Sequence, residues 1–118
     1  MVKFINIKIF IYLSKMEKLY KKQKKFQELV GNDIISQQFR NDMMLALIAE
    51  VIEAANETPW KPWKKHQSFD RKKFLEELAD VQIFLINLVL SANADYKEFE
   101  KIIENKINTN FKRQKNGY

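Results

Sequence analysis

The chain contains no cysteine and a single histidine, His66. The absence of cysteine excludes disulfides, thiolate zinc sites and cysteine nucleophiles, and one histidine disfavours a multi-histidine metal site. The chain also has only two glycines and two prolines among its 118 residues. So few turn-forming residues disfavour a β-rich fold and favour long helices, which predicts one all-α domain.

The net charge of +6 is concentrated at the N-terminus. Residues 1–30 carry eight lysines and two acids, whereas the remainder carries 13 basic and 13 acidic residues. A lysine-rich stripe of this kind can bind nucleic acid. A solvated helix face explains it more simply, so a nucleic-acid partner is disfavoured.

Residues 1–14 form an apolar N-terminal appendage, whose β-branched residues suit a short strand or a disordered tail. An alternative is that the native product begins at Met16. The run is too short to span a bilayer as a helix and lacks a small-residue cleavage site. We therefore expect residues 15–118 to form a single cytoplasmic domain with no membrane partner.

Apolar residues at helical spacing predict four helices, over about 15–30, 36–57, 70–93 and 96–114. Gly31 is placed to end the first, and Asp70 and Asp95 to cap the third and fourth. The third is apolar almost all round from Val81 to Leu90, which predicts a central buried helix. These features predict an antiparallel four-helix bundle-like core. Its apolar surface is too broad for a lone small bundle to cover, which predicts a homodimer.

The two central helices each carry a pair of acids, Glu50-x-x-Glu53 and Glu77-x-x-Asp80. Residues i and i+3 share a helix face, so antiparallel packing would bring four carboxylates together. Repulsion and desolvation penalise such a cluster, and no Lys or Arg lies between residues 41 and 60 to neutralise the first pair. A hard cation relieves that penalty, so the pattern predicts a Mg²⁺ site for phosphate chemistry. Solvated surface acids are the alternative.

Three features together resemble the all-α nucleoside triphosphate pyrophosphatases, a superfamily that includes the MazG proteins and the dimeric dUTPases. The first is the acidic motif. The second is the loop Trp60-Lys61-Pro62-Trp63-Lys64-Lys65, which resembles the tryptophan-rich loop of dimeric dUTPases and phage dCTPase/dUTPase enzymes. The third is the closing segment Arg113-Gln114-Lys115-Asn116-Gly117-Tyr118. The resemblance spans about residues 16–118, although the chain is shorter than typical dimeric dUTPases and lacks their additional helices.

The resemblance implies Mg²⁺-dependent hydrolysis of dUTP to dUMP and pyrophosphate by a homodimer. Glu50, Glu53, Glu77 and Asp80 would be the catalytic and metal-binding residues, holding two or more Mg²⁺ ions, with Mn²⁺ as a substitute. Glu50 would also orient or deprotonate the attacking water.

The triphosphate also needs cationic side chains from the protein. Lys106, Asn110 and Arg113 share one face of the last helix and suit phosphate, although a basic helix end favoured by the helix dipole explains them too. Lys64 in the loop and Tyr118 in the closing segment complete this part of the expected substrate site.

The base requires a different set of contacts. The amide of Gln23, at the position where the family contacts the base, can pair with a pyrimidine edge. Trp60 and Trp63 can stack on the base or cap the core beneath their loop. Asn87 either lies near the substrate or links two helices.

Four other functions compete with a dUTPase. Within the class, the chain could be a dCTPase or a broad-specificity MazG-like enzyme. Outside it, a non-catalytic helical module could bind nucleic acid through the lysines of residues 15–25, or a structural helical dimer could carry solvated acids.

Overall fold

The computed structural model describes residues 13–117, which form four α-helices and no strand. The helices are α2 (Lys15–Val30), α3 (Gln37–Asn56), α4 (Arg71–Ser91) and α5 (Tyr96–Lys115). The all-α prediction is confirmed, and every helix end lies within two residues of its predicted position. The expectations for residues 1–12 and for Tyr118 lie outside the described range.

Each helix begins at a side-chain oxygen that accepts a hydrogen bond from the backbone N–H three residues later. These caps are Ser14, Ser36, Asp70 and Asp95. Helix α2 ends at Gly31, whose φ of 86° lies in the left-handed region that glycine adopts without strain. The predicted stop at Gly31 and the predicted caps at Asp70 and Asp95 are therefore confirmed.

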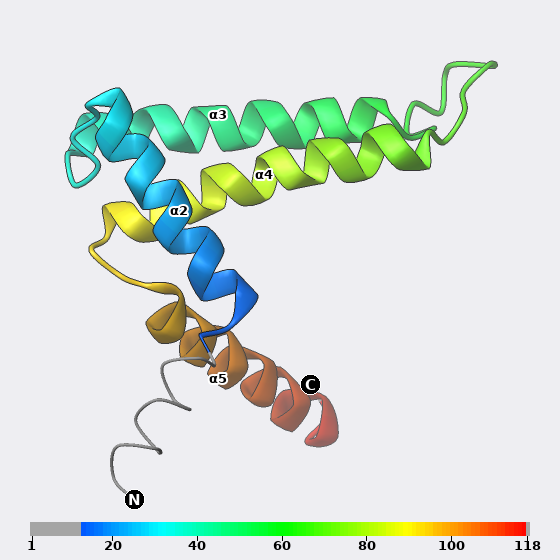
Figure 1. The fold of residues 1–118 in the computed structure, drawn as a ribbon. Coiled ribbons are helices and arrows are strands. Elements are labelled where there is room, and N and C mark those ends of the chain that lie inside the picture. The colour runs from blue at the N-terminus through cyan, green and yellow to red at the C-terminus, as the bar shows by residue number, and fades with distance from the viewer. Residues whose placement is uncertain (1–12, 118) are drawn as a thin grey trace, which may run out of the picture.

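The centre of the fold is an antiparallel hairpin of α3 and α4 (Figure 1). Helix α2 crosses the hairpin at the end where α3 begins and α4 finishes, and it packs mainly on α4. The long loop between the two hairpin helices projects from the opposite end (Figure 1). The hairpin therefore has one end covered by α2, here called the closed end, and one end formed by the loop, here called the open end.

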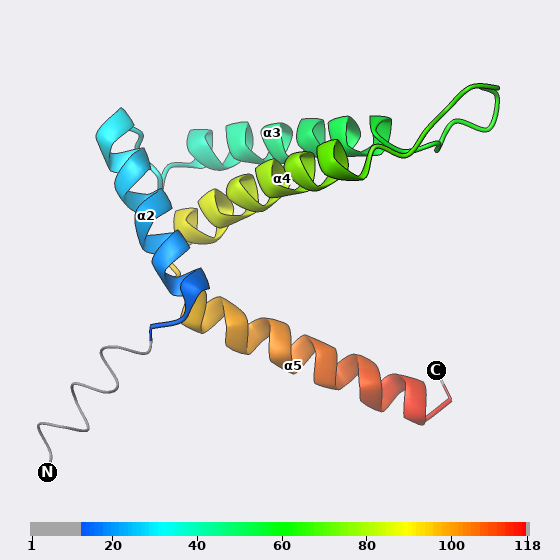
Figure 2. The ribbon, with the colours of Figure 1, turned by 45° about the vertical axis from the view of Figure 1, so that its right-hand side comes forward.

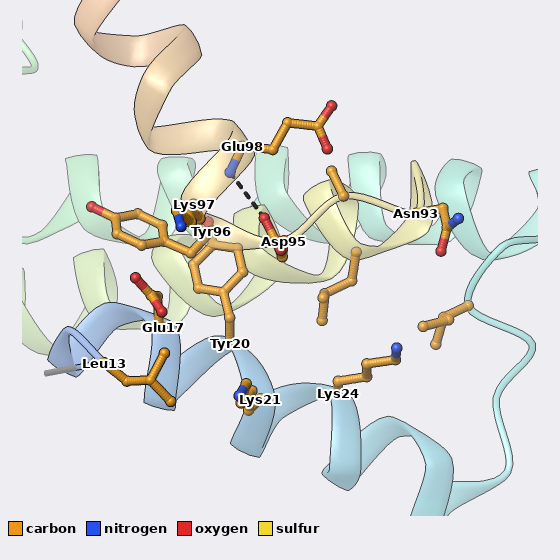
Figure 3. A pocket seen from close by; sticks show the side chains of 13 residues that line it. Leu13, Glu17, Tyr20, Lys21, Lys24, Asn93, Asp95, Tyr96, Lys97 and Glu98 are labelled. Atoms are coloured by element: carbon orange, nitrogen blue, oxygen red, sulfur yellow. Dashed lines mark hydrogen bonds between the residues drawn. The ribbon is translucent and has the colours of Figure 1, made fainter. Parts of the chain in front are cut away.

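The hydrophobic core lies at the closed end. Tyr20 of α2 packs there with Ile86, Val89 and Leu90 of α4. The Tyr20 ring also contacts the Tyr96 ring, with centroids 5.1 Å apart, beside a pocket of about 540 Å³ (Figure 3). Burial, and then the neighbouring Tyr96, raises the pKa of Tyr20 to about 12.

The prediction that α4 is buried throughout Val81–Leu90 holds only for its last part. The buried residues of α4 begin at Ile86, whereas Ile83 is 40% exposed and Leu78 is 39% exposed. The reason is that α2 covers only the closed end, so toward the open end α4 packs mainly on α3 among the described helices.

Helix α5 extends away from the hairpin (Figure 2) and packs mainly on α2. Residues Tyr96–Lys115 include no buried residue within the described chain, and Ile102, Ile107 and Phe111 are exposed.

Candidate functional site

The hairpin brings together acids that lie far apart in the sequence. Carboxylate oxygens of Glu50 and Glu53 on α3 and of Glu77 on α4 all lie within 4.8 Å of one another. Glu50 Oε2 and Glu77 Oε2 are buried and have no hydrogen-bond partner among residues 13–117. Two buried acceptors without donors are costly unless something else satisfies them.

The pKa values of two of these acids are raised, which shows that their ionised forms are disfavoured here. Burial, and then the adjacent Glu53 carboxylate, raises the pKa of Glu50 to about 7 from its ordinary value of 4.5. Burial is also the largest cause of the raised pKa of Glu77. Like charges and desolvation both disfavour the ionised forms, so the centre favours a partner that carries positive charge.

Asp80 lies outside the group of three. Its charge nevertheless raises the pKa values of both Glu50 and Glu77, which places it close to the cluster. Asp80 is exposed and follows Glu77 by one helical turn. The donor set fits a hard divalent cation, because it offers carboxylate oxygens alone and two of them lack partners.

An amide network lies toward the closed end, on the same helix faces as the acids. Asn87 Oδ1 accepts from Gln23 Nε2 at 2.9 Å and from Gln27 Nε2 at 3.4 Å. Asn87 follows Asp80 by seven residues, which is two turns or about 10 Å along a helix. Asn87 is 1% exposed, and its bonds to Gln23 and Gln27 join α4 to α2. Of the two predicted roles for Asn87, the link between helices is therefore observed.

The network extends to two residues that sequence reasoning missed. Asn87 Nδ2 donates to Met43 Sδ at 3.3 Å, and Asn32 Nδ2 donates to Gln27 Oε1 at 2.6 Å. Gln27 was missed as well, although it follows Gln23 by one turn, and a second amide on that face was the available signal. Met43 precedes Glu50 by seven residues, but a methionine on an apolar helix face gave no reason to select it.

The tryptophan loop lies toward the open end. The rings of Trp60 and Trp63 meet edge to face, with centroids 5.7 Å apart. Trp60 is 49% exposed and Trp63 is 72% exposed, so neither caps the core. Lys61 Nζ lies 5.7 Å from the Trp60 ring centroid, and Lys64 lines a pocket of about 440 Å³ beside Trp60.

The basic residues of α5 form a separate group. Lys106, Asn110 and Arg113 line one shallow pocket of about 300 Å³ on α5, which confirms that they share a face. Figures 1 and 2 both show α5 leaving the hairpin that carries the acids. A single chain therefore does not bring this face to the acidic centre.

The sequence model of the family described as dUTPase matches residues 15–116. The chain belongs to the dUTPase family. Membership supports a nucleotide pyrophosphohydrolase activity, and the matched range includes the acidic centre, the amide network and the α5 face. No curated protein and no solved structure gives a significant match.

Among residues 13–117, no helix of this dUTPase-family chain is both long and apolar enough to cross a membrane.

Proposed function

We propose that the chain hydrolyses dUTP to dUMP and pyrophosphate in the cytoplasm, with Mg²⁺ as cofactor. The observation that carries the proposal is the pair of buried, unpartnered oxygens, Glu50 Oε2 and Glu77 Oε2. Family membership supplies the nucleotide as substrate. Mg²⁺, when bound, would neutralise phosphate charge and lower the pKa of a bound water.

Each acid has a role in this proposal. Glu50, Glu53, Glu77 and Asp80 hold two or more divalent ions, and Mn²⁺ can replace Mg²⁺ because it also accepts carboxylate ligands. Glu50 additionally orients the attacking water and takes its proton.

The hairpin offers two places for the base, one on each side of the acids, and the closed end is favoured. The half-buried Gln23, bonded to the buried Asn87, presents an amide there. Asn87 lies about two helical turns from Asp80, a span suited to a sugar and its phosphates. The triphosphate then extends to the acids. Trp60, Trp63 and Lys64 lie at the far side, where they can close over the phosphates and exclude water.

The site also needs a second copy of the chain. Exposed apolar residues, including Leu45 and Ile48 on α3, supply a suitable face. Pairing would bring Lys106, Asn110 and Arg113 of α5, followed by Tyr118, to the acids and the triphosphate.

The test of the reaction is pyrophosphate release from dUTP, dCTP, dTTP and ATP, with Mg²⁺ and with EDTA. We expect Mg²⁺-dependent release from dUTP. Release from several nucleotides at similar rates would instead identify a broad MazG-like enzyme. No release from any of them would contradict the proposal and leave the lysines of residues 15–25 as the next surface to test.

The test of the dimer is sedimentation of wild type and of Leu45→Glu, which places a charge on the exposed α3 face. We expect a dimer for wild type, and a monomer with little activity for the variant. A wild-type monomer with full activity would contradict the shared site.

A further inference from the structure

In the amide network, each side chain has its nitrogen toward one neighbour and its oxygen toward the other. Met43 fixes which way round this is. A side-chain amide has a donor end and an acceptor end, and the two can exchange places by a rotation of 180°. A thioether sulfur can accept a hydrogen bond but cannot donate one. Because Met43 Sδ lies 3.3 Å from Asn87 Nδ2, the nitrogen of Asn87 faces the sulfur and its oxygen faces α2.

The direction of Asn87 then sets the direction of both glutamines. Asn87 Oδ1 can only accept, so Gln23 and Gln27 must both present Nε2 to it, as they do at 2.9 and 3.4 Å. Gln27 is turned the same way from its other end, where its Oε1 accepts from Asn32 Nδ2. Gln27 is only 6% exposed, so it has no solvent to compensate for a reversed amide.

The orientation of Asn87 also orients Gln23, the half-buried residue at the end of the network. Its Nε2 is engaged by Asn87, and no group among residues 13–117 donates to its Oε1. Gln23 therefore presents a ligand with one fixed order of donor and acceptor. A glutamine that rotates freely could pair with the N3–H and O4 of uracil or with the N4–H and N3 of cytosine, because these edges carry opposite orders.

We propose that Gln27 and Met43 are positioning residues that fix the amide direction of Gln23 and so commit the site to one pyrimidine base. This rests on the proposed function, in which that base is uracil. The hydrogen-bonded amides of Gln27 and Asn87 behind Gln23 are here called the relay. Discrimination between uracil and cytosine then comes from the relay, because a base with the opposite order of donor and acceptor would leave buried polar groups unpaired.

The decisive variant is Gln27→Glu, which keeps the shape of the side chain and, when its carboxylate is ionised, removes its donor. Its carboxylate still accepts from Asn32, but Asn87 must now turn Nδ2 toward it. Gln23 would then meet a donor and turn its Oε1 inward, which reverses the edge that faces the ligand. Met43→Leu removes the sulfur that fixes the direction without adding a charge, and Met44→Leu is the control, because Met44 is exposed and outside the network.

Two measurements are made on each full-length variant: the ratio of kcat/KM for dUTP over dCTP, and the ratio of Kd for their non-hydrolysable α,β-imido analogues. A ratio cancels any loss of folded protein. We expect both preferences for uracil to fall at least about tenfold in Gln27→Glu, to fall by less in Met43→Leu, and to be unchanged in Met44→Leu.

The outcomes separate the relay from the proposed function. Absence of pyrophosphate release from every nucleotide would contradict the proposed function, while the analogue Kd ratio would still test the relay. Preferences unchanged within twofold in both Gln27→Glu and Met43→Leu would overturn the relay, as would a wild type that does not discriminate between the two analogues. If Gln27→Glu fails to fold, Met43→Leu decides.

Discussion

The two ends of the α3–α4 hairpin flank the same acidic centre but are built in opposite ways. At the closed end, α2 covers the hairpin, and Asn87 and Gln27 are buried in a connected amide network. At the open end, Trp60 and Trp63 are exposed on a loop. The Gln67 side chain, which bonds the backbone of Lys61 and Lys64, is the main hydrogen-bonded support of that loop.

This difference separates two tasks. Groups that are already ordered before binding lose little entropy when a ligand arrives, so the closed end suits recognition of a base. Exposed rings on a loop can change position, so the open end suits closure over the substrate once it is bound. The acids lie between the two ends. The predictions that follow test whether the two ends differ in this way.

The largest effect is expected at the shared centre. Glu77→Gln removes one of the two buried carboxylate oxygens that lack partners. Activity on dUTP should fall more than about 100-fold, because even groups that merely orient metal ligands typically contribute 10- to 100-fold. The measurement is pyrophosphate release at saturating Mg²⁺. The matched control is Glu76→Gln at the adjacent, exposed position, and an equal loss there would mean that general charge, not the site, is responsible.

The next largest effect is a difference in the free energy of unfolding between variants at the closed end and at the open end. Asn87→Leu leaves the amides of Gln23 and Gln27 without their acceptor, so the free energy of unfolding should fall by about 2 kcal/mol or more. Trp63→Leu should change it by less than about 0.5 kcal/mol, because Trp63 is largely exposed. Urea unfolding without nucleotide measures both. Equal losses would contradict the contrast between a packed end and an open one.

The smallest effect is a dependence on pH. The pKa of Glu50 is raised from 4.5 to about 7, so the fold favours its protonated form. That stabilisation is complete below about pH 4.5 and is lost as pH rises through 7. The metal-free Tm of wild type should therefore fall over this window relative to Glu50→Gln, which stays neutral.

Mg²⁺ should act in the opposite sense, because it binds the ionised carboxylates. The increase in Tm on adding Mg²⁺ should be larger at pH 8 than at pH 5.5. Scanning calorimetry with and without EDTA measures it, and an increase that does not depend on pH would exclude Glu50 as the titrating ligand.

The sequence was sufficient to predict the helices and the acidic pairs. Helix ends depend on local chemistry, such as Gly31 in its left-handed conformation and Asp70 as a cap. The spacing of Glu50 and Glu53 fixes which face they share, and the antiparallel loop connection brings them to Glu77. Each of these inferences uses residues close together in the chain, or one short connection.

The direction of the amide network could not be predicted. It depends on Met43 and Gln27, which belong to different segments and meet at Asn87 only after α2 has crossed the hairpin. The position of α5 could not be predicted either. Its apolar and basic faces indicate what kind of surface it contacts, but not whether that surface belongs to the same chain.

Helix α5 has no buried residue within residues 13–117, although it carries Lys106, Asn110 and Arg113. Because its own chain buries so little of α5, we expect contact with a second copy of the chain to place it at the acidic centre. If the proposed dimer forms, the rate per chain should decline as the enzyme is diluted below its dissociation constant, and assays at nanomolar and micromolar concentrations should not superimpose.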